Sequence, residues 1–166
     1  MKKNQKGFSL IELLIVVVVI GIIAAIAIPN LLAARRAANE GSAQSTVRTL
    51  HSAQVTYAAT NGNGSYADTM AKLGPAPGAG MVDAQVADAT NGKSGFKFGT
   101  VAANTATPYT FVVDAVPTVP AAGVTQTGTR RFCIATDGVV RSDNTAANIG
   151  TQLTAANGCT YGEIVQ

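Results

Sequence analysis

One stretch near the amino terminus decides the architecture of this chain: Lys6-Gly7-Phe8-Ser9-Leu10-Ile11-Glu12-Leu13-Leu14. A short polar segment precedes it, and a run of 22 residues without a charge, 13–34, begins at its end. At ~1.5 Å per residue, a helix of that length reaches roughly 33 Å, enough to cross the hydrocarbon core of a bilayer. Glu12 lies just before this run, and an ionised side chain costs on the order of 2.5–3.5 kcal/mol at mid-membrane depth. We therefore expect Glu12 to have a function and to need a cationic partner.

Two simpler interpretations compete for this region. One is a secretory signal peptide, in which three lysines form the positive end and Ala25-Ile26-Ala27 forms the cleavage site. The apolar run is about twice the usual 7–15 residues, and Pro29 follows the supposed cut closely. The other is a plain single-span anchor, which leaves Glu12 without an explanation.

The segment from Lys6 to Ile15 resembles the class III signal of type IV pilins and the related pseudopilins. A glycine, an aromatic residue, a short gap and a glutamate stand at fixed places before a long apolar run. The resemblance implies that residues 1–7 are a leader, cut after Gly7 on the cytoplasmic side by a prepilin peptidase, and that the new terminus at Phe8 is N-methylated. It also implies that Glu12, the fifth residue of the mature chain, meets the terminal amine of a neighbouring subunit.

A long helix is expected over residues 8–60, with a transmembrane part at about 13–34. Glycine weakens a helix and proline removes a backbone donor, although membrane helices tolerate both. In pilus fibres of the family that this chain resembles, the helix is locally unwound between a glycine and a proline. Here that segment would run from Gly21 to Pro29.

The second half of the helix is predicted to be amphipathic and to pack on a soluble head. Its inward stripe follows i, i+4, i+7, i+11 and i+14, and only a glutamine interrupts its apolar character. The glycine-rich segment 61–64 is expected to end the helix, and residues 61–166 to form the head. The stripe comprises Ala43, Val47, Leu50, Gln54 and Tyr57.

The head is expected to be a loop followed by a small antiparallel sheet. Residues 65–93 are predicted to be mostly irregular, with one short helix at 68–73. Aromatic and β-branched runs separated by turn residues predict three or four strands. The candidate strands are 95–99, 109–113, 131–136 and 139–141. The fold class is therefore α+β, and the resemblance identifies it with the pilin fold.

Cys133 and Cys159 are the only cysteines. In an exported domain an even count favours a disulfide, and two free thiols are the alternative. A bond would fasten the polar carboxy-terminal segment to the sheet. The resemblance supports it, because pilins carry a disulfide in the corresponding region.

Other function classes have little support in the sequence. Twelve basic residues oppose nine acidic ones, but three of the basic residues lie in the leader, so the mature chain is near neutral and nucleic acid is an unlikely partner. His51 is the only histidine and is predicted to be an ordinary surface or interface residue. Major pseudopilins bind calcium in a carboxy-terminal loop, but Asp137, Asp143 and Glu163 are too scattered to predict that site. We expect no catalytic residue, no metal and no cofactor.

The sequence therefore predicts a structural subunit rather than an enzyme. It would be a single-pass inner-membrane precursor, surrounded by lipid, that polymerises with copies of itself into an extracellular type IV pilus. The resemblance implies a prepilin peptidase and methylase and an inner-membrane assembly machinery as partners, and adhesion, twitching motility and DNA uptake as roles. The alternatives are a pseudopilin of a type II secretion system and a membrane-tethered binding module that does not polymerise.

Overall fold

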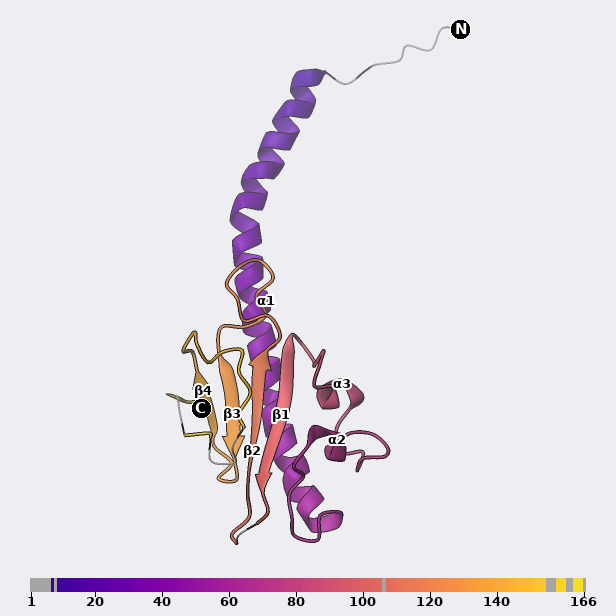
Figure 1. The fold of residues 1–166 in the computed structure, drawn as a ribbon. Coiled ribbons are helices and arrows are strands. Elements are labelled where there is room, and N and C mark those ends of the chain that lie inside the picture. Colours follow the sequence, from indigo (N-terminus) through magenta and orange to yellow (C-terminus); the bar gives the residue numbers. More distant parts are fainter. Residues whose placement is uncertain (1–6, 8, 106, 155–157, 161–162, 166) are drawn as a thin grey trace, which may run out of the picture. The chain divides into compact units, whose positions relative to one another are not determined.

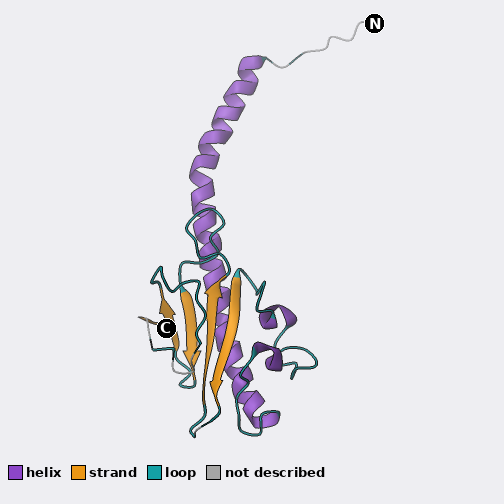
Figure 2. Ribbon diagram, viewed as in Figure 1, coloured by secondary structure: helices purple, strands orange, loops and turns teal. Residues whose placement is uncertain are grey.

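The computed structural model describes residues 7, 9–105, 107–154, 158–160 and 163–165. One long helix is followed by two short helices and five strands (Figures 1 and 2). Their bounds are α1 Leu10–Thr60, α2 Met70–Leu73, α3 Ala84–Ala87, β1 Phe96–Ala103, β2 Thr110–Pro117, β3 Arg131–Ala135, β4 Val140–Asp143 and β5 Glu163–Ile164. Contacts divide the chain into two compact units, 1–35 and 36–166, and each is described by itself.

The first unit contains the beginning of α1, which is apolar on every side. Its large hydrophobic side chains, from Leu10 to Leu31, are nearly all exposed. A helix that is hydrophobic all round needs an apolar environment, and α1 is the one helix among the described residues that is long and apolar enough to cross a membrane. The segment from Gly21 to Pro29 is helical in this single subunit. Its unwinding stays a prediction for the fibre.

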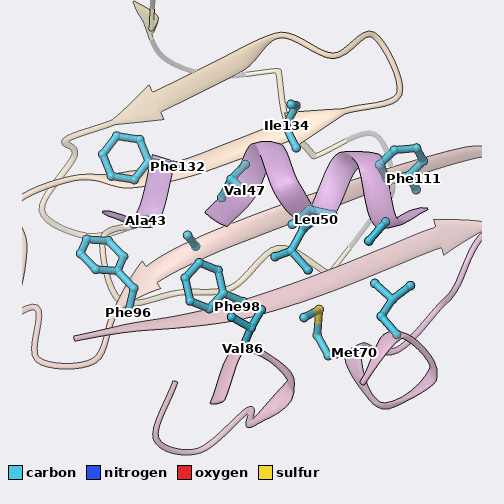
Figure 3. Close-up of a cluster of buried hydrophobic side chains, with 14 of the residues drawn as sticks. Ala43, Val47, Leu50, Met70, Val86, Phe96, Phe98, Phe111, Phe132 and Ile134 are labelled. Carbon is cyan, nitrogen blue, oxygen red and sulfur yellow. The ribbon is translucent and has the colours of Figure 1, made fainter. Parts of the chain in front are cut away.

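The second unit is built from residues 36–60 of α1 packed on one face of the sheet. The predicted inward stripe is right for Ala43, Val47, Leu50 and Gln54, all of which are fully buried, while Tyr57 is half-buried. Figure 3 shows the helix side chains lying among the aromatic residues of the sheet. The sheet contributes Phe96, Phe98, Phe111, Phe132 and Ile134 to this core.

The sheet is an antiparallel meander in the order β1-β2-β3-β4-β5. The four strands predicted from the sequence are present, and β1 and β2 each extend to eight residues. The expected number of strands, three or four, was too low, because a fifth strand, β5, pairs with β4 near the carboxy terminus. A two-residue strand lacks the alternating pattern that sequence analysis requires.

The connection between α1 and the sheet contains one helix that was expected and one that was not. Asn63 and Gly64, with φ of 47° and 89°, reverse the chain after the helix, as glycine-rich termini do. Helix α2 lies within the predicted segment 68–73. Helix α3 was predicted as loop, but the side chain of Asp83 caps it by accepting a hydrogen bond from the Val86 N–H at 2.8 Å.

Residues 144–154 and 158–160, which we call the strap, contact the other face of the sheet through Leu153 and Cys159. A disulfide joins Cys133 of β3 to Cys159 of the strap, with Cα atoms 5.8 Å apart. Both cysteines are buried, and Val112 of β2 packs with them. The disulfide-closed carboxy-terminal region predicted from the sequence is therefore present.

Candidate assembly and anchoring sites

The amino-terminal site predicted from the sequence is open in the single subunit. Gly7 is exposed, and a side chain at this position would meet no atom within 4 Å. Phe8 lies outside the described residues. Glu12 stands exposed in the first turn of α1, where a carboxylate is favoured by the helix dipole. The ion pairs of the described residues do not include Glu12.

Gly21 and Pro29 both lie within α1. A side chain at Gly21 would meet no atom within 4 Å, so close packing inside this subunit does not require glycine there. Pro29 lies inside the helix and lacks the backbone donor that the preceding turn would accept. The two positions are weak points of a helix that is otherwise rich in β-branched side chains.

A carboxylate that the sequence analysis missed fastens α1 to the head. Glu40 is buried, and its Oε1 accepts bonds from the backbone N–H and hydroxyl of Thr129 at 2.7 and 2.8 Å. Its Oε2 accepts bonds from Nε and Nη2 of Arg130 at 3.1 and 2.9 Å. Glu40 lies three residues before Ala43, on the inward stripe. A charged residue on the inward stripe of an amphipathic helix was the sequence signal that could have pointed to this site.

The donors around Glu40 favour its ionised form. Burial raises the pKa, but the hydrogen bonds from Thr129 and the bonds and charge of Arg130 together lower it below its ordinary value. The same loop is bound twice more to α1. Arg36 Nη1 donates to Gln126 Oε1 at 2.6 Å, and Asn39 Nδ2 donates to the Thr127 carbonyl at 3.1 Å.

Gln54, the polar residue in the predicted stripe, satisfies a buried backbone segment. Its Nε2 donates to the carbonyl of Ala67 at 2.8 Å, and its Oε1 accepts from the N–H of the same residue at 2.9 Å. A third bond, at 2.6 Å, joins Nε2 to the hydroxyl of Thr100 in β1. Buried polar groups are tolerated when they are bonded in this way, so the interruption of the stripe fixes how the connection after α1 runs.

Two charged groups of the sheet hold the strap beside the disulfide. Arg131 Nη2 pairs with Asp143 Oδ2 at 2.9 Å, and its Nη1 donates to the Thr151 carbonyl at 3.0 Å. Burial raises the pKa of Asp143, but bonds from Thr145, Asn148 and Arg131 lower it to about 2.

Asp114 of β2 lies buried on the same face as the disulfide and opposes Cys133 in the strand register. Its Oδ2 accepts a bond from the backbone N–H of Leu153 at 3.1 Å. Burial raises the pKa of Asp114 to about 6, although that bond and the charge of Arg131 oppose the rise. The strap is therefore held by the disulfide, by hydrogen bonds to Arg131 and Asp143, which pair with each other in the sheet, and by a bond to Asp114, a carboxylate that is costly to ionise.

The residues considered for catalysis or metal binding do not form a site. His51 is half-buried, its ring lies 5.3 Å from that of Phe111, and its Nε2 has no hydrogen-bond partner among the described residues. Asp137 pairs with Arg141 at 2.7 Å. Within the described ranges, no three histidine, cysteine, aspartate or glutamate side chains come together in a way that could hold a metal.

Comparison with known proteins places the strongest similarity at the amino terminus. A family profile described as the prokaryotic N-terminal methylation motif matches residues 2–28. This chain carries that motif. Together with the long apolar helix, the antiparallel sheet and the disulfide, the motif makes the chain similar to pilins and pseudopilins.

Relatives from both branches of the pilin and pseudopilin family are similar to this chain. The major component of the type IV wide pilus of Thermus thermophilus is 66% identical over 38 residues, which are 23% of this chain and 29% of that protein. The type IV major pilin of Myxococcus xanthus is 38% identical over 74 residues, 45% of this chain and 33% of the relative. The type II secretion system core protein G of Aeromonas hydrophila is 35% identical over 60 residues, 36% of this chain and 42% of the relative.

These pilin matches are partial. They span between 29% and 42% of the length of the relatives, and no solved structure matches the chain. The similarity therefore supports a subunit of a pilus or of a pseudopilus, whereas the architecture of the head follows from its own geometry.

Proposed function

We propose that this protein is the structural subunit of an extracellular type IV pilus and polymerises through its amino-terminal helix. The chain would divide into a leader at 1–7, the helix at 8–60 and the head at 61–166. The observation that carries the proposal is the exposed, uncharged run 13–34 of α1, which begins directly after Glu12. Such a surface serves as a membrane span before assembly and as the core of a fibre afterwards.

Assembly would begin with cleavage after Gly7. A prepilin peptidase in the inner membrane would release a new amine at Phe8 and methylate it. That amine is a cation, and Glu12 of the adjoining subunit would pair with it at similar depth. Each charge alone is costly in an apolar setting, and pairing offsets part of the cost. The pair would set the axial register, while apolar packing would supply most of the adhesion and Gly21 to Pro29 would unwind to fit the fibre.

The runner-up function is a pseudopilin of a type II secretion system. The similarity to core protein G over 60 residues favours it. The higher identity to the pilus component of Thermus thermophilus, 66% over 38 residues, favours the pilus. Adhesion, twitching motility and DNA uptake would be activities of the assembled fibre, reached through an assembly machinery in the inner membrane.

The test is to shear filaments from the surface of the source cells and to identify their subunit by mass spectrometry. Peptides of this chain as the main constituent would support the pilus. Filaments that lack it, in cells whose protein export fails when the chain is deleted, would support the pseudopilus. A chain found only in the membrane, with neither defect on deletion, would contradict both.

A further inference from the structure

The loop between β2 and β3 ends in a compact, closed tip. Val119 and Thr127 form its neck, because the Thr127 N–H donates to the Val119 carbonyl and the Val119 N–H donates to Thr127 Oγ1, both at 3.1 Å. Beyond the neck, Gln126 closes the tip by donating from Nε2 to the Pro120 carbonyl at 3.2 Å. We call residues 120–125 the tip loop.

The tip loop presents small apolar side chains to solvent. Its sequence is Pro-Ala-Ala-Gly-Val-Thr, all six residues are exposed, and none is charged. Val124 is 72% exposed, more than any other large hydrophobic side chain of the described residues in the unit 36–166. The head leaves this apolar group uncovered although most of its other large side chains are buried.

Hydrogen bonds to α1 fix the position of the tip loop along the axis of the helix. Thr129 meets Glu40, Thr127 meets Asn39 and Gln126 meets Arg36. The chain therefore runs toward the amino-terminal end of the helix as it approaches the tip, so the tip lies on that side of its neck. Arg36 is only the second residue after the uncharged run 13–34.

We infer that the tip loop rests in the lipid interface of the membrane that holds the subunit before assembly. This inference rests on the proposed function only in that residues 13–34 span a membrane. Arg36 would then lie at the depth of the phosphate headgroups. Its Nη1 is bonded to Gln126, and its remaining donors can reach a phosphate.

The attraction of so small a loop for lipid is weak by itself, since membrane binding scales with buried apolar area and with charge. Tethering removes that obstacle. Arg36 follows the run 13–34 closely in the chain and is bonded to Gln126, so the local concentration of the loop near the membrane is high and a weak preference suffices. An anionic phospholipid surface suits the uncharged tip loop beside a guanidinium.

The chain contains no tryptophan, so one introduced indole reports alone. The experiment places Val124→Trp in the full-length chain, reconstituted in vesicles of phosphatidylethanolamine and phosphatidylglycerol with acyl chains brominated close to the headgroup. The matched control is Val55→Trp, at a 49% exposed position of α1. Val55 lies 19 residues beyond Arg36, about 28 Å along the helix.

We expect brominated lipid to remove most of the indole fluorescence of the Val124→Trp variant and to leave that of the Val55→Trp variant unchanged. Adding Gln126→Ala, which removes the bond to Arg36, should return the indole of the Val124→Trp variant partly to solvent and weaken the quenching. Formation of the Cys133–Cys159 disulfide in every variant checks that the head has folded.

Two results overturn the inference. The Val124→Trp variant could emit like a solvated indole without quenching, which would show that the tip loop stays in water. It could also emit as a buried indole without quenching, which would show that a second copy of the chain covers the loop. Filaments formed normally by the same cells would show in either case that the proposed function still stands.

Discussion

The Glu40 carboxylate and the Arg130 guanidinium form a two-point contact, with Oε2 of Glu40 3.1 Å from Nε and 2.9 Å from Nη2 of Arg130. The carboxylate is buried, whereas Arg130 remains 41% exposed. The contact joins α1, near the start of the compact unit 36–166, to the residue that precedes β3. A load carried along α1 would therefore reach the sheet partly through this pair.

Glu40→Gln should lower the free energy of unfolding by about 1–3 kcal/mol at neutral pH, because buried bonds to a charged group are lost. The folded-state pKa of Glu40 is lowered, so this stability is present above its unfolded pKa and is lost as pH falls through the folded value. The difference between variant and parent should thus shrink in acid. Urea unfolding of the full chain in detergent, followed by tyrosine fluorescence, measures it. Asp68→Asn, which breaks an exposed pair with Lys72, is the control and should cost under about 1 kcal/mol.

Asp114→Asn should have the opposite pH dependence. Burial raises the folded-state pKa of Asp114 to about 6 from an ordinary value of 3.8. The folded state then binds more protons, so the contribution of Asp114 is fully present below 3.8 and declines as pH rises toward 6. The difference of 2.2 corresponds to at most ~3 kcal/mol. Asparagine keeps an acceptor for the Leu153 N–H, so the variant should equal or exceed the parent in stability at pH 7 and gain nothing at pH 4. A variant that is less stable at pH 7 than at pH 4 relative to the parent would contradict this.

The sequence predicted the parts of the fold that follow a period or a turn. The inward stripe of α1 and the four longer strands left such a signal, whereas the carboxy-terminal disulfide was predicted from the even number of cysteines and from the resemblance to pilins. Helix α3 spans only four residues and β5 only two, which is too short for any periodicity to develop. The Glu40 site escaped because its partners lie about 90 residues away in a loop without regular pattern.

For Gln54, the sequence predicted the position of the side chain but not its hydrogen-bond partners. Its inward position followed from the stripe, and its burial is confirmed. Its partners Ala67 and Thr100 could not be predicted, because a side chain that bridges a loop and a strand depends on tertiary packing. The amino-terminal motif differs again, since the processing and assembly that we propose for it involve other proteins and other subunits rather than contacts within one chain.

Removing the disulfide should loosen the strap. Cys159→Ser opens a link between residues 26 apart, which is worth roughly 3–3.5 kcal/mol in the chain-entropy model and within the usual 2–5 kcal/mol for small exported domains. The double variant Cys133→Ser, Cys159→Ser serves as the control without an unpaired thiol and should lose a similar amount. Non-reducing mass mapping of the native protein should recover the two cysteines in one cross-linked peptide pair. Recovery of both as free thiols would refute the bond.

Gly7 should be required for processing. Gly7 itself is exposed and has no side chain, so a bulky replacement such as Gly7→Leu should hinder access to the scissile bond and leave the leader attached. Gly7→Ala is the milder comparison and should be cut more readily. Intact-mass measurement should give a mature chain that begins at Phe8 and carries one methyl group. A terminus near Ile28, or retention of Met1 in filaments, would instead support a different processing route.

Glu12→Gln separates polymer from tether most sharply. The substitution keeps the shape of the side chain and removes its charge, in an exposed first turn where no partner within the described residues depends on it. Membrane insertion and cleavage after Gly7 should therefore be normal. Assembly or methylation should fail, because the Phe8 amine of a neighbouring subunit would enter an apolar environment without a counter-ion.

Glu12→Asp, which keeps the charge on a shorter side chain, should retain more assembly than Glu12→Gln. Electron microscopy of sheared filaments, with immunoblots of the membrane fraction, measures both steps. If cells that depend on this chain as their main subunit make filaments of normal number and length with Glu12→Gln, charge pairing does not set the register of the fibre, and apolar packing alone has to do so.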